Sequence, residues 1–170
     1  MKKLIFVLFF AITLVGCSET EPAIYTENQQ NYDLFKSSDF DFSGLVVVKE
    51  LVSGGLEFTI TLAGPTGDAN TNYPAHLHFG DIEEPNVVIA AMLNPVNSAT
   101  LKSTTIIKDL TDGTKLNFES FKIFQGHIKV HLASDGPDYK VILVSGHVGN
   151  NSIRSSDFDR SKIAVCGNTF

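Results

Sequence analysis

Apolar and polar residues alternate along most of the chain after Phe42, with the period of two that is typical of strands with one buried face. The clearest example is LEFTITL, residues 56–62, in which single polar residues separate the apolar ones. Residues 45–51 are more continuously apolar, and Ser53-Gly54-Gly55 between the two segments predicts the turn of a hairpin. Further strands are predicted at residues 75–79, 87–93, 101–107, 127–133 and 139–148.

One segment departs from this period. Leu116, Phe118, Phe121 and Phe124 have spacings that fit a short helix, which we predict before the strand at 127–133. Seven or so short strands with turn residues between them predict an all-β domain, a β-sandwich. The sequence has no glycine-rich phosphate loop, no Ser-His-Asp order and no CxxC pair.

The N-terminus is typical of an exported protein. Lys2 and Lys3 precede an apolar run, residues 4–15, that is too short to span a bilayer comfortably. The next residues complete the motif LVGC, which resembles the lipobox of bacterial lipoproteins, where the signal peptide is cut before a cysteine that then carries lipid. Residues 1–16 are therefore the predicted signal peptide and Cys17 the predicted lipidation site. The alternative is an ordinary signal peptide with an incidental cysteine.

The predicted location follows from the lipid and the residues after it. Ser18 and Glu19 resemble the sorting signal of outer-membrane lipoproteins, so we expect a lipoprotein of the cell envelope that is attached to the outer membrane and faces the periplasm or the cell surface. The membrane is then a partner only through the lipid on Cys17. A protein or glycan partner is not identified by the sequence.

Charge and composition indicate which partners and which domain boundaries to expect. The chain has 170 residues and a formal net charge of −6; removing residues 1–16 also removes two lysines, which leaves 154 residues and a charge of −8. A surface of this charge repels nucleic acid, so no nucleic-acid partner is expected. We expect a polar tether at residues 17–36 and a single domain at residues 37–170. Cys166 then has no second cysteine to pair with, and its role stays open.

Four of the five histidines form two pairs on predicted strands. In AHLHF, residues 75–79, Leu77 faces the core, so His76 and His78 face the opposite side, which we expect to be exposed to solvent. In GHIKVHL, residues 126–132, the same alternation turns His127 and His131 outward, with Lys129 between them. Cα atoms two residues apart lie roughly 7 Å from each other, a spacing that lets two imidazoles bind one ion.

A metal site follows if the two strands are neighbours. His76, His78 and His131 are then the predicted ligands, with His127 and His147 as lesser candidates for a fourth ligand or for a donor to a ligand. Oxygen ligands are available in Asp81, Glu83 and Glu84, although a loop of this kind is usually only solvated. The alternative is that the histidines are polar residues on an exposed strand face. If the His78 side chain is exposed to solvent, His78→Ala is expected to abolish metal uptake with little loss of stability.

Two segments of the chain resemble known families. AHLHFGDIEEPNVVIAAMLNP, residues 75–95, and GHIKVHLASDGPDYKVILVSG, residues 126–146, resemble the signature segments of CHRD (chordin-type) domains. They also resemble the copper/zinc superoxide dismutases, whose closing Ala-Cys-Gly is similar to residues 164–167. The resemblance covers about residues 43–167. It implies a superoxide dismutase-like Greek-key β-sandwich and places His76, His78 and His131 at positions of copper ligands.

The chain also departs from the dismutase pattern. Met92 falls where the dismutases have the histidine that bridges copper and zinc, and no cluster of zinc-binding histidines follows it, so zinc is not expected as a second metal. Ile163 falls at the position of the arginine that draws superoxide to the metal. Cys166 has no cysteine with which to form the expected disulfide. The CHRD pattern tolerates these changes, whereas full dismutase activity does not.

Three functions therefore remain open. The first is a lipid-anchored, CHRD-like binding or structural domain outside the cytoplasm, with or without a copper ion bound through outward-facing histidines, that lacks full dismutase activity. The second is a copper-dependent superoxide dismutase with a degenerate zinc site, and the third is a periplasmic carrier of copper or zinc. Three imidazoles suit copper and zinc alike, so the sequence does not identify the metal. It also does not decide whether the chain is an enzyme.

Overall fold

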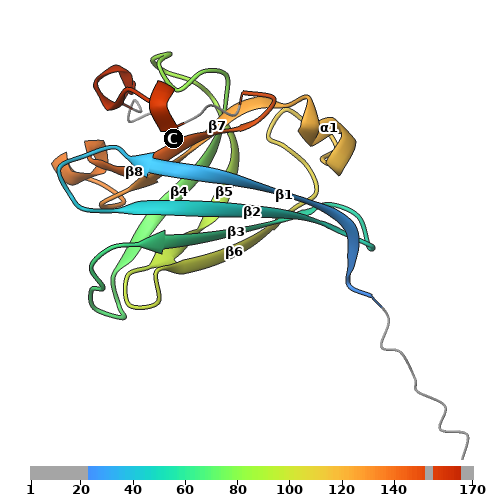
Figure 1. Cartoon of the computed structure of the whole chain (residues 1–170), viewed down its shortest axis with the longest axis horizontal. Coiled ribbons are helices and arrows are strands. Elements are labelled where there is room, and N and C mark those ends of the chain that lie inside the picture. Colours follow the sequence, from blue (N-terminus) through green and yellow to red (C-terminus); the bar gives the residue numbers. More distant parts are fainter. Residues whose placement is uncertain (1–22, 152–154, 166–170) are drawn as a thin grey trace, which may run out of the picture.

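Eight antiparallel strands form a closed barrel in the spatial order β1-β2-β3-β6-β5-β4-β7-β8 (Figure 1). The computed structural model describes residues 23–151 and 155–165, so the signal peptide, Cys17 and Cys166 lie outside the described residues. The strands are β1 (Tyr25–Lys36), β2 (Ser43–Leu51), β3 (Leu56–Ala63), β4 (Asn72–Phe79), β5 (Ile89–Asn97), β6 (Lys102–Ile107), β7 (Gln125–His131) and β8 (Ile142–Gly149). One α-helix, α1 (Phe118–Lys122), and the 3-10 helices η1 (Pro137–Lys140), η2 (Ser155–Asp157) and η3 (Arg160–Lys162) complete the described elements.

The all-β prediction is confirmed, and the two-residue period has the expected cause. In β3 the apolar residues are buried and the polar residues between them are half-buried, so one face of the strand lines the core. The predicted hairpin is also present, because β2 pairs with β3 from Ser43 opposite Ala63 to Glu50 opposite Leu56. No helix among residues 23–151 and 155–165 has the length and apolar character needed to cross a membrane.

The first strand corrects the prediction of a tether that reaches Lys36. Residues 25–36 form β1, which pairs with β2 along most of its length and with β8 near its end. Tyr32 and Leu34 are its only residues classed as buried. The strand was not predicted because its sequence is mostly polar and lacks a long apolar alternation. Main-chain hydrogen bonds to two neighbouring strands stabilise β1 instead.

The short predicted helix is present as α1. Asn117 caps its N-terminus, with its side-chain oxygen accepting a hydrogen bond of 2.8 Å from the backbone of Ser120. Phe121 is fully buried, and its ring meets the rings of Phe58 and Tyr32 edge to face, with centroids 5.3 and 5.8 Å away. The helix therefore packs against the barrel core through Phe121.

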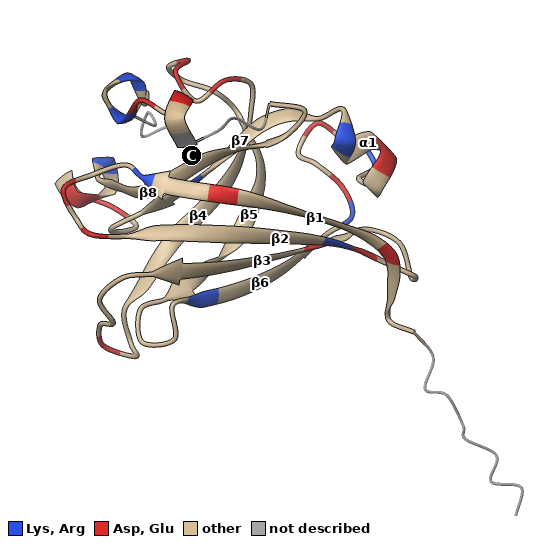
Figure 2. Ribbon diagram, viewed as in Figure 1, with Lys and Arg blue, Asp and Glu red and all other residues tan. Residues whose placement is uncertain are grey.

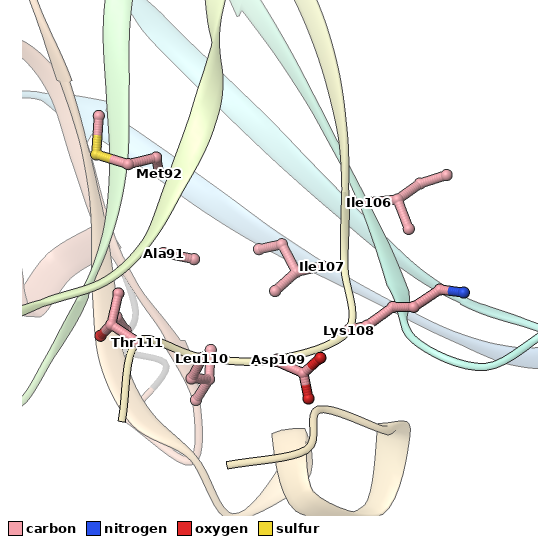
Figure 3. A pocket seen from close by; sticks show the side chains of 9 residues that line it. Ala91, Met92, Ile106, Ile107, Lys108, Asp109, Leu110 and Thr111 are labelled. Carbon is pink, nitrogen blue, oxygen red and sulfur yellow. The ribbon is translucent and has the colours of Figure 1, made fainter. Parts of the chain in front are cut away.

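A surface groove lies where β5 and β6 diverge. The register between these strands joins Asn97 to Lys102, and the side chain of Asn94 also donates a hydrogen bond to the carbonyl of Thr104. Beyond this point an open groove of about 470 Å³ is lined by Ala91, Ile107 and neighbouring residues (Figure 3). None of the histidines lines this groove.

A core substitution tests the predicted parity of β4. Leu77 is fully buried within the hydrophobic core, so Leu77→Ala is expected to lower the free energy of unfolding by about 2 to 5 kcal/mol through lost contacts and a cavity. Urea unfolding of the metal-free protein measures the change. Met92→Ala is the control, because Met92 on the neighbouring strand is 58% exposed. Equal, small effects of the two substitutions would contradict this placement of Leu77.

Candidate metal centre

Strands β4 and β7 are neighbours, as the metal prediction requires. Their register places Leu77 opposite Ile128, His76 opposite Lys129 and His78 opposite His127. Leu77 and Ile128 are fully buried in the barrel core. Because side chains alternate along each strand, the histidines of both strands project from the outer face of the barrel.

The outer face is not exposed here, which corrects the expectation of histidines in solvent. His76 is 2% exposed, His78 is 1% exposed and His131 is 0% exposed. Part of the cover is Tyr139 of η1, whose ring stacks on His131 with centroids 4.5 Å apart and planes 2° from parallel. His78→Ala is consequently no longer expected to leave stability unchanged, because it removes a buried side chain.

The chain after β8 supplies another layer, which we call the C-terminal cover, residues 155–165. It lies over β7 and β8 in Figure 1. Phe158 contacts Phe35 of β1, with ring centroids 4.7 Å apart, and the backbone amide of Ala164 donates a hydrogen bond of 3.0 Å to the carbonyl of Ile82. The Nζ atom of Lys129 donates a hydrogen bond of 2.7 Å to the carbonyl of Ala164. The cover is therefore attached to the histidine-bearing strand itself.

The three predicted ligands meet. One nitrogen from each of His76, His78 and His131 lies within 4.8 Å of the other two, and these are the ligand-type side chains that form such a group within the described residues. The ring centroid of His76 is 5.8 Å from that of His78 and 5.2 Å from that of His131. Nitrogens that share one ion at about 2 Å each lie at most about 4 Å apart, so small rotations of these rings would bring the three nitrogens onto one ion.

Hydrogen bonding selects the ligand atom of His131. Its Nδ1 lies 2.7 Å from the carbonyl oxygen of Tyr139, which can only accept, so Nδ1 carries the proton. Nε2 then carries the lone pair and is the atom available to a metal. A backbone carbonyl that orients an imidazole in this way is the usual partner of a metal-binding histidine.

Burial keeps the imidazoles neutral. Desolvation, which penalises the charged ring, lowers the pKa of His78 to about 3, and the nearby His127 and Lys129 charges act in the same direction. Desolvation also lowers the pKa of His131 to about 4, against the opposing hydrogen bond to Tyr139, and it lowers the pKa of His76. At neutral pH these rings therefore carry the lone pairs that a metal ion requires.

The two lesser candidates lie beside this group but not in it. The ring of His127 stacks on His78, with centroids 5.0 Å apart and planes 8° from parallel. In-plane lone pairs of parallel rings run alongside each other and do not converge on one ion. His147 lies one strand further away, opposite His127 in the register of β7 and β8.

The charged residues near the three histidines form contacts within the protein. Lys129 is fully buried and holds the C-terminal cover, so it is not a cation open to an approaching anion. Asp81 lies 3.5 Å from Nε2 of His147, and Glu83 pairs with Lys162 of the cover at 3.6 Å. Figure 2 shows most charged residues in loops, helices and the cover, and fewer on the strands.

Two features of the centre were missed by sequence reasoning. Tyr139 both stacks on His131 and accepts its hydrogen bond, yet the sequence predicted Tyr139 as the first residue of the strand at 139–148. In the structure it belongs to η1, and β8 begins at Ile142. The C-terminal cover has no strand period and so gave no signal. A proline and a glycine beside an aromatic residue, directly after a histidine strand, are the one hint of a folded-back turn.

The lowered pKa values predict acid sensitivity of the metal-free protein. The folded pKa values of His78, His127 and His131 lie near 3, 4 and 4, below the ordinary 6.5. The unfolded chain therefore binds protons that the folded chain does not, and stability present above pH 6.5 is lost as the pH falls toward 4. We expect a loss of about 1 to 2 kcal/mol per histidine between pH 7 and pH 5, measured by urea unfolding at constant ionic strength. A stability that rises on acidification would contradict neutral buried rings.

Comparisons with protein-family models, with curated proteins and with solved structures gave no match to this chain. What the protein does is therefore inferred from its own residues. The most informative of them are the three buried imidazoles and the contacts that orient and cover them.

Proposed function

We propose that this protein is a lipid-anchored, extracytoplasmic, CHRD-like domain that binds copper through His76, His78 and His131. The observation that carries the proposal is the convergence of three buried ring nitrogens within 4.8 Å of one another. Imidazole suits both copper and zinc. Copper is favoured because the resemblance to the superoxide dismutases places these histidines at copper-ligand positions. The attachment and location follow the lipobox-like motif that ends at Cys17.

The burial of the site favours binding of a metal ion rather than catalytic turnover of a substrate. Redox turnover of superoxide needs an open coordination position, and a cationic approach speeds the capture of the anion. The three ligands are at most 2% exposed, and Lys129 donates its hydrogen bond to the C-terminal cover. The nearby loop carries Asp81 and Glu83, which repel an anion. We therefore propose a copper-binding or copper-carrying domain without full dismutase activity.

The strand order favours the dismutase alternative. Strands β4, β5 and β6 follow one another, and β7 returns after a long connection through α1 to lie beside β4. This strand order supports the Greek-key topology that the resemblance to superoxide dismutases implies. In the dismutase alternative, His76, His78 and His131 would hold the copper ion, which would supply one-electron redox chemistry for superoxide.

Copper binding by single variants tests the proposal. His131→Gln removes the ring that Tyr139 orients, so the variant is expected to bind one copper equivalent fewer per chain than the unmodified protein. The measurement is equilibrium dialysis against Cu(II) with a competing chelator, after circular dichroism has shown that the variant is folded. Ser145→Ala is the matched control, because Ser145 is equally buried on β8 and is bonded to Ser37, and it should keep the full copper content.

Three outcomes decide among the candidate functions. Equal copper content in His131→Gln and in the control would refute copper binding at these histidines. Rapid superoxide consumption by the copper-loaded protein that His131→Gln abolishes would establish the dismutase instead. Copper binding with slow or no superoxide consumption supports the proposed binding domain.

A further inference from the structure

A second pair of histidines lies next to the three-histidine group, on β7 and β8. His127 and His147 are directly opposite each other in the register of these strands. His127 is fully buried and His147 is 8% exposed. Burying an imidazole removes its hydration, which is costly unless its nitrogens bind other groups. The binding partner of each ring nitrogen is therefore important.

One nitrogen of each ring has an oxygen partner. Nδ1 of His127 donates a hydrogen bond of 3.0 Å to the carbonyl of Gly80, which leaves the lone pair on Nε2. Nε2 of His147 lies 3.5 Å from a carboxylate oxygen of Asp81, and it accepts a long hydrogen bond of 3.4 Å from the backbone amide of Ile82. A metal ion on Nδ1 of His147 requires the other tautomer, in which Nε2 gives up the Ile82 bond and donates to Asp81.

The other nitrogen of each ring is buried and has no hydrogen-bond partner within residues 23–151 and 155–165. These atoms are Nε2 of His127 and Nδ1 of His147. The ring centroids are 6.3 Å apart and the planes are inclined at 70°, so the rings do not stack. Two imidazoles that bind one ion from opposite sides have their nitrogens about 4 Å apart, since each bond is about 2 Å, and the ring separation permits this.

The surrounding contacts are those of metal-binding histidines. Such a histidine commonly donates its second N–H to a backbone carbonyl or a carboxylate, which fixes the tautomer and the ring orientation. Gly80 supplies the carbonyl for His127, and Asp81 supplies the carboxylate for His147. Two consecutive residues after β4 therefore orient both rings.

We propose that Nε2 of His127 and Nδ1 of His147 form a second cation site, for a divalent ion of the zinc class, with water completing the coordination. The site is separate from the three-histidine group because the His127 ring lies parallel to His78, so its lone pair does not point into that group. It also differs from the zinc site of the dismutases, since the resemblance places neither histidine at a ligand position. The inference does not require that copper occupies the first site.

Zinc binding by single variants tests the site. The purified protein is titrated with Zn²⁺ and its bound zinc is measured after gel filtration. We expect two ions per chain in the unmodified protein and one in His147→Phe, which keeps an aromatic ring but removes the ligand. His147 is chosen over His127 because His127 also stacks on a ligand of the first group. Anomalous diffraction at the zinc edge should place the second ion between His127 and His147.

A substitution of the orienting carboxylate keeps the test independent of folding. The Asp81 side chain is half exposed, so Asp81→Asn is expected to fold and to weaken zinc binding at the second site about 10- to 100-fold. The matched control is Glu84→Gln, which removes one negative charge from the same loop without a histidine contact. It should leave both affinities unchanged.

The outcomes separate this inference from the proposed function. Zinc content that is the same in His147→Phe and in the unmodified protein, or a diffraction map with only water between the two rings, overturns the second site. Loss of an ion in His147→Phe together with full zinc and copper content in His131→Gln supports the second site and overturns the proposed function. Equal weakening by Asp81→Asn and Glu84→Gln indicates a general charge effect and refutes the role of Asp81.

Discussion

The alternation of side chains along β4 and β7 is the constraint on which the metal centre depends. Leu77 and Ile128 fill the barrel core, and this packing commits the residues on either side to the outer face. Since the strands are adjacent and in register, imidazoles from two distant parts of the chain meet there without any long loop to hold them. A shift of one residue between the strands would exchange the two faces, so hydrophobic packing is what fixes the positions of the ligands.

Residues outside the barrel bury the histidine face and shield it from water. Tyr139 stacks on one ring, and the C-terminal cover contacts β1, the loop after β4 and Lys129. Desolvation is tolerated because the imidazoles stay neutral and carbonyl groups of Gly80 and Tyr139 accept hydrogen bonds from them. The same desolvation gives the rings the protonation state that suits a cation. The sensitivity of stability to acid and the lone pairs that a cation would require therefore have a common physical origin in this part of the molecule.

The sequence predicted those features that depend on local pattern. The alternation in residues 56–62 and the spacing of the histidines located strands, the three histidines that lie close together and the face that bears them, and the phenylalanine spacing located α1. Burial of His76 and His78 could not be predicted, because it depends on residues 155–165, which fold back from far along the chain and have no period of their own. The strand β1 was missed for a related reason: its polar residues are supported by main-chain pairing with β2 and β8, which leaves no apolar pattern.

The position of the C-terminal cover in the chain has a consequence for assembly. The three histidines lie between residues 76 and 131, whereas the cover follows β8 and is the last described segment. When the chain folds from its N-terminus, the histidine-bearing strands are present before the residues that enclose them. The imidazoles are thus open to solvent until the cover folds back over them.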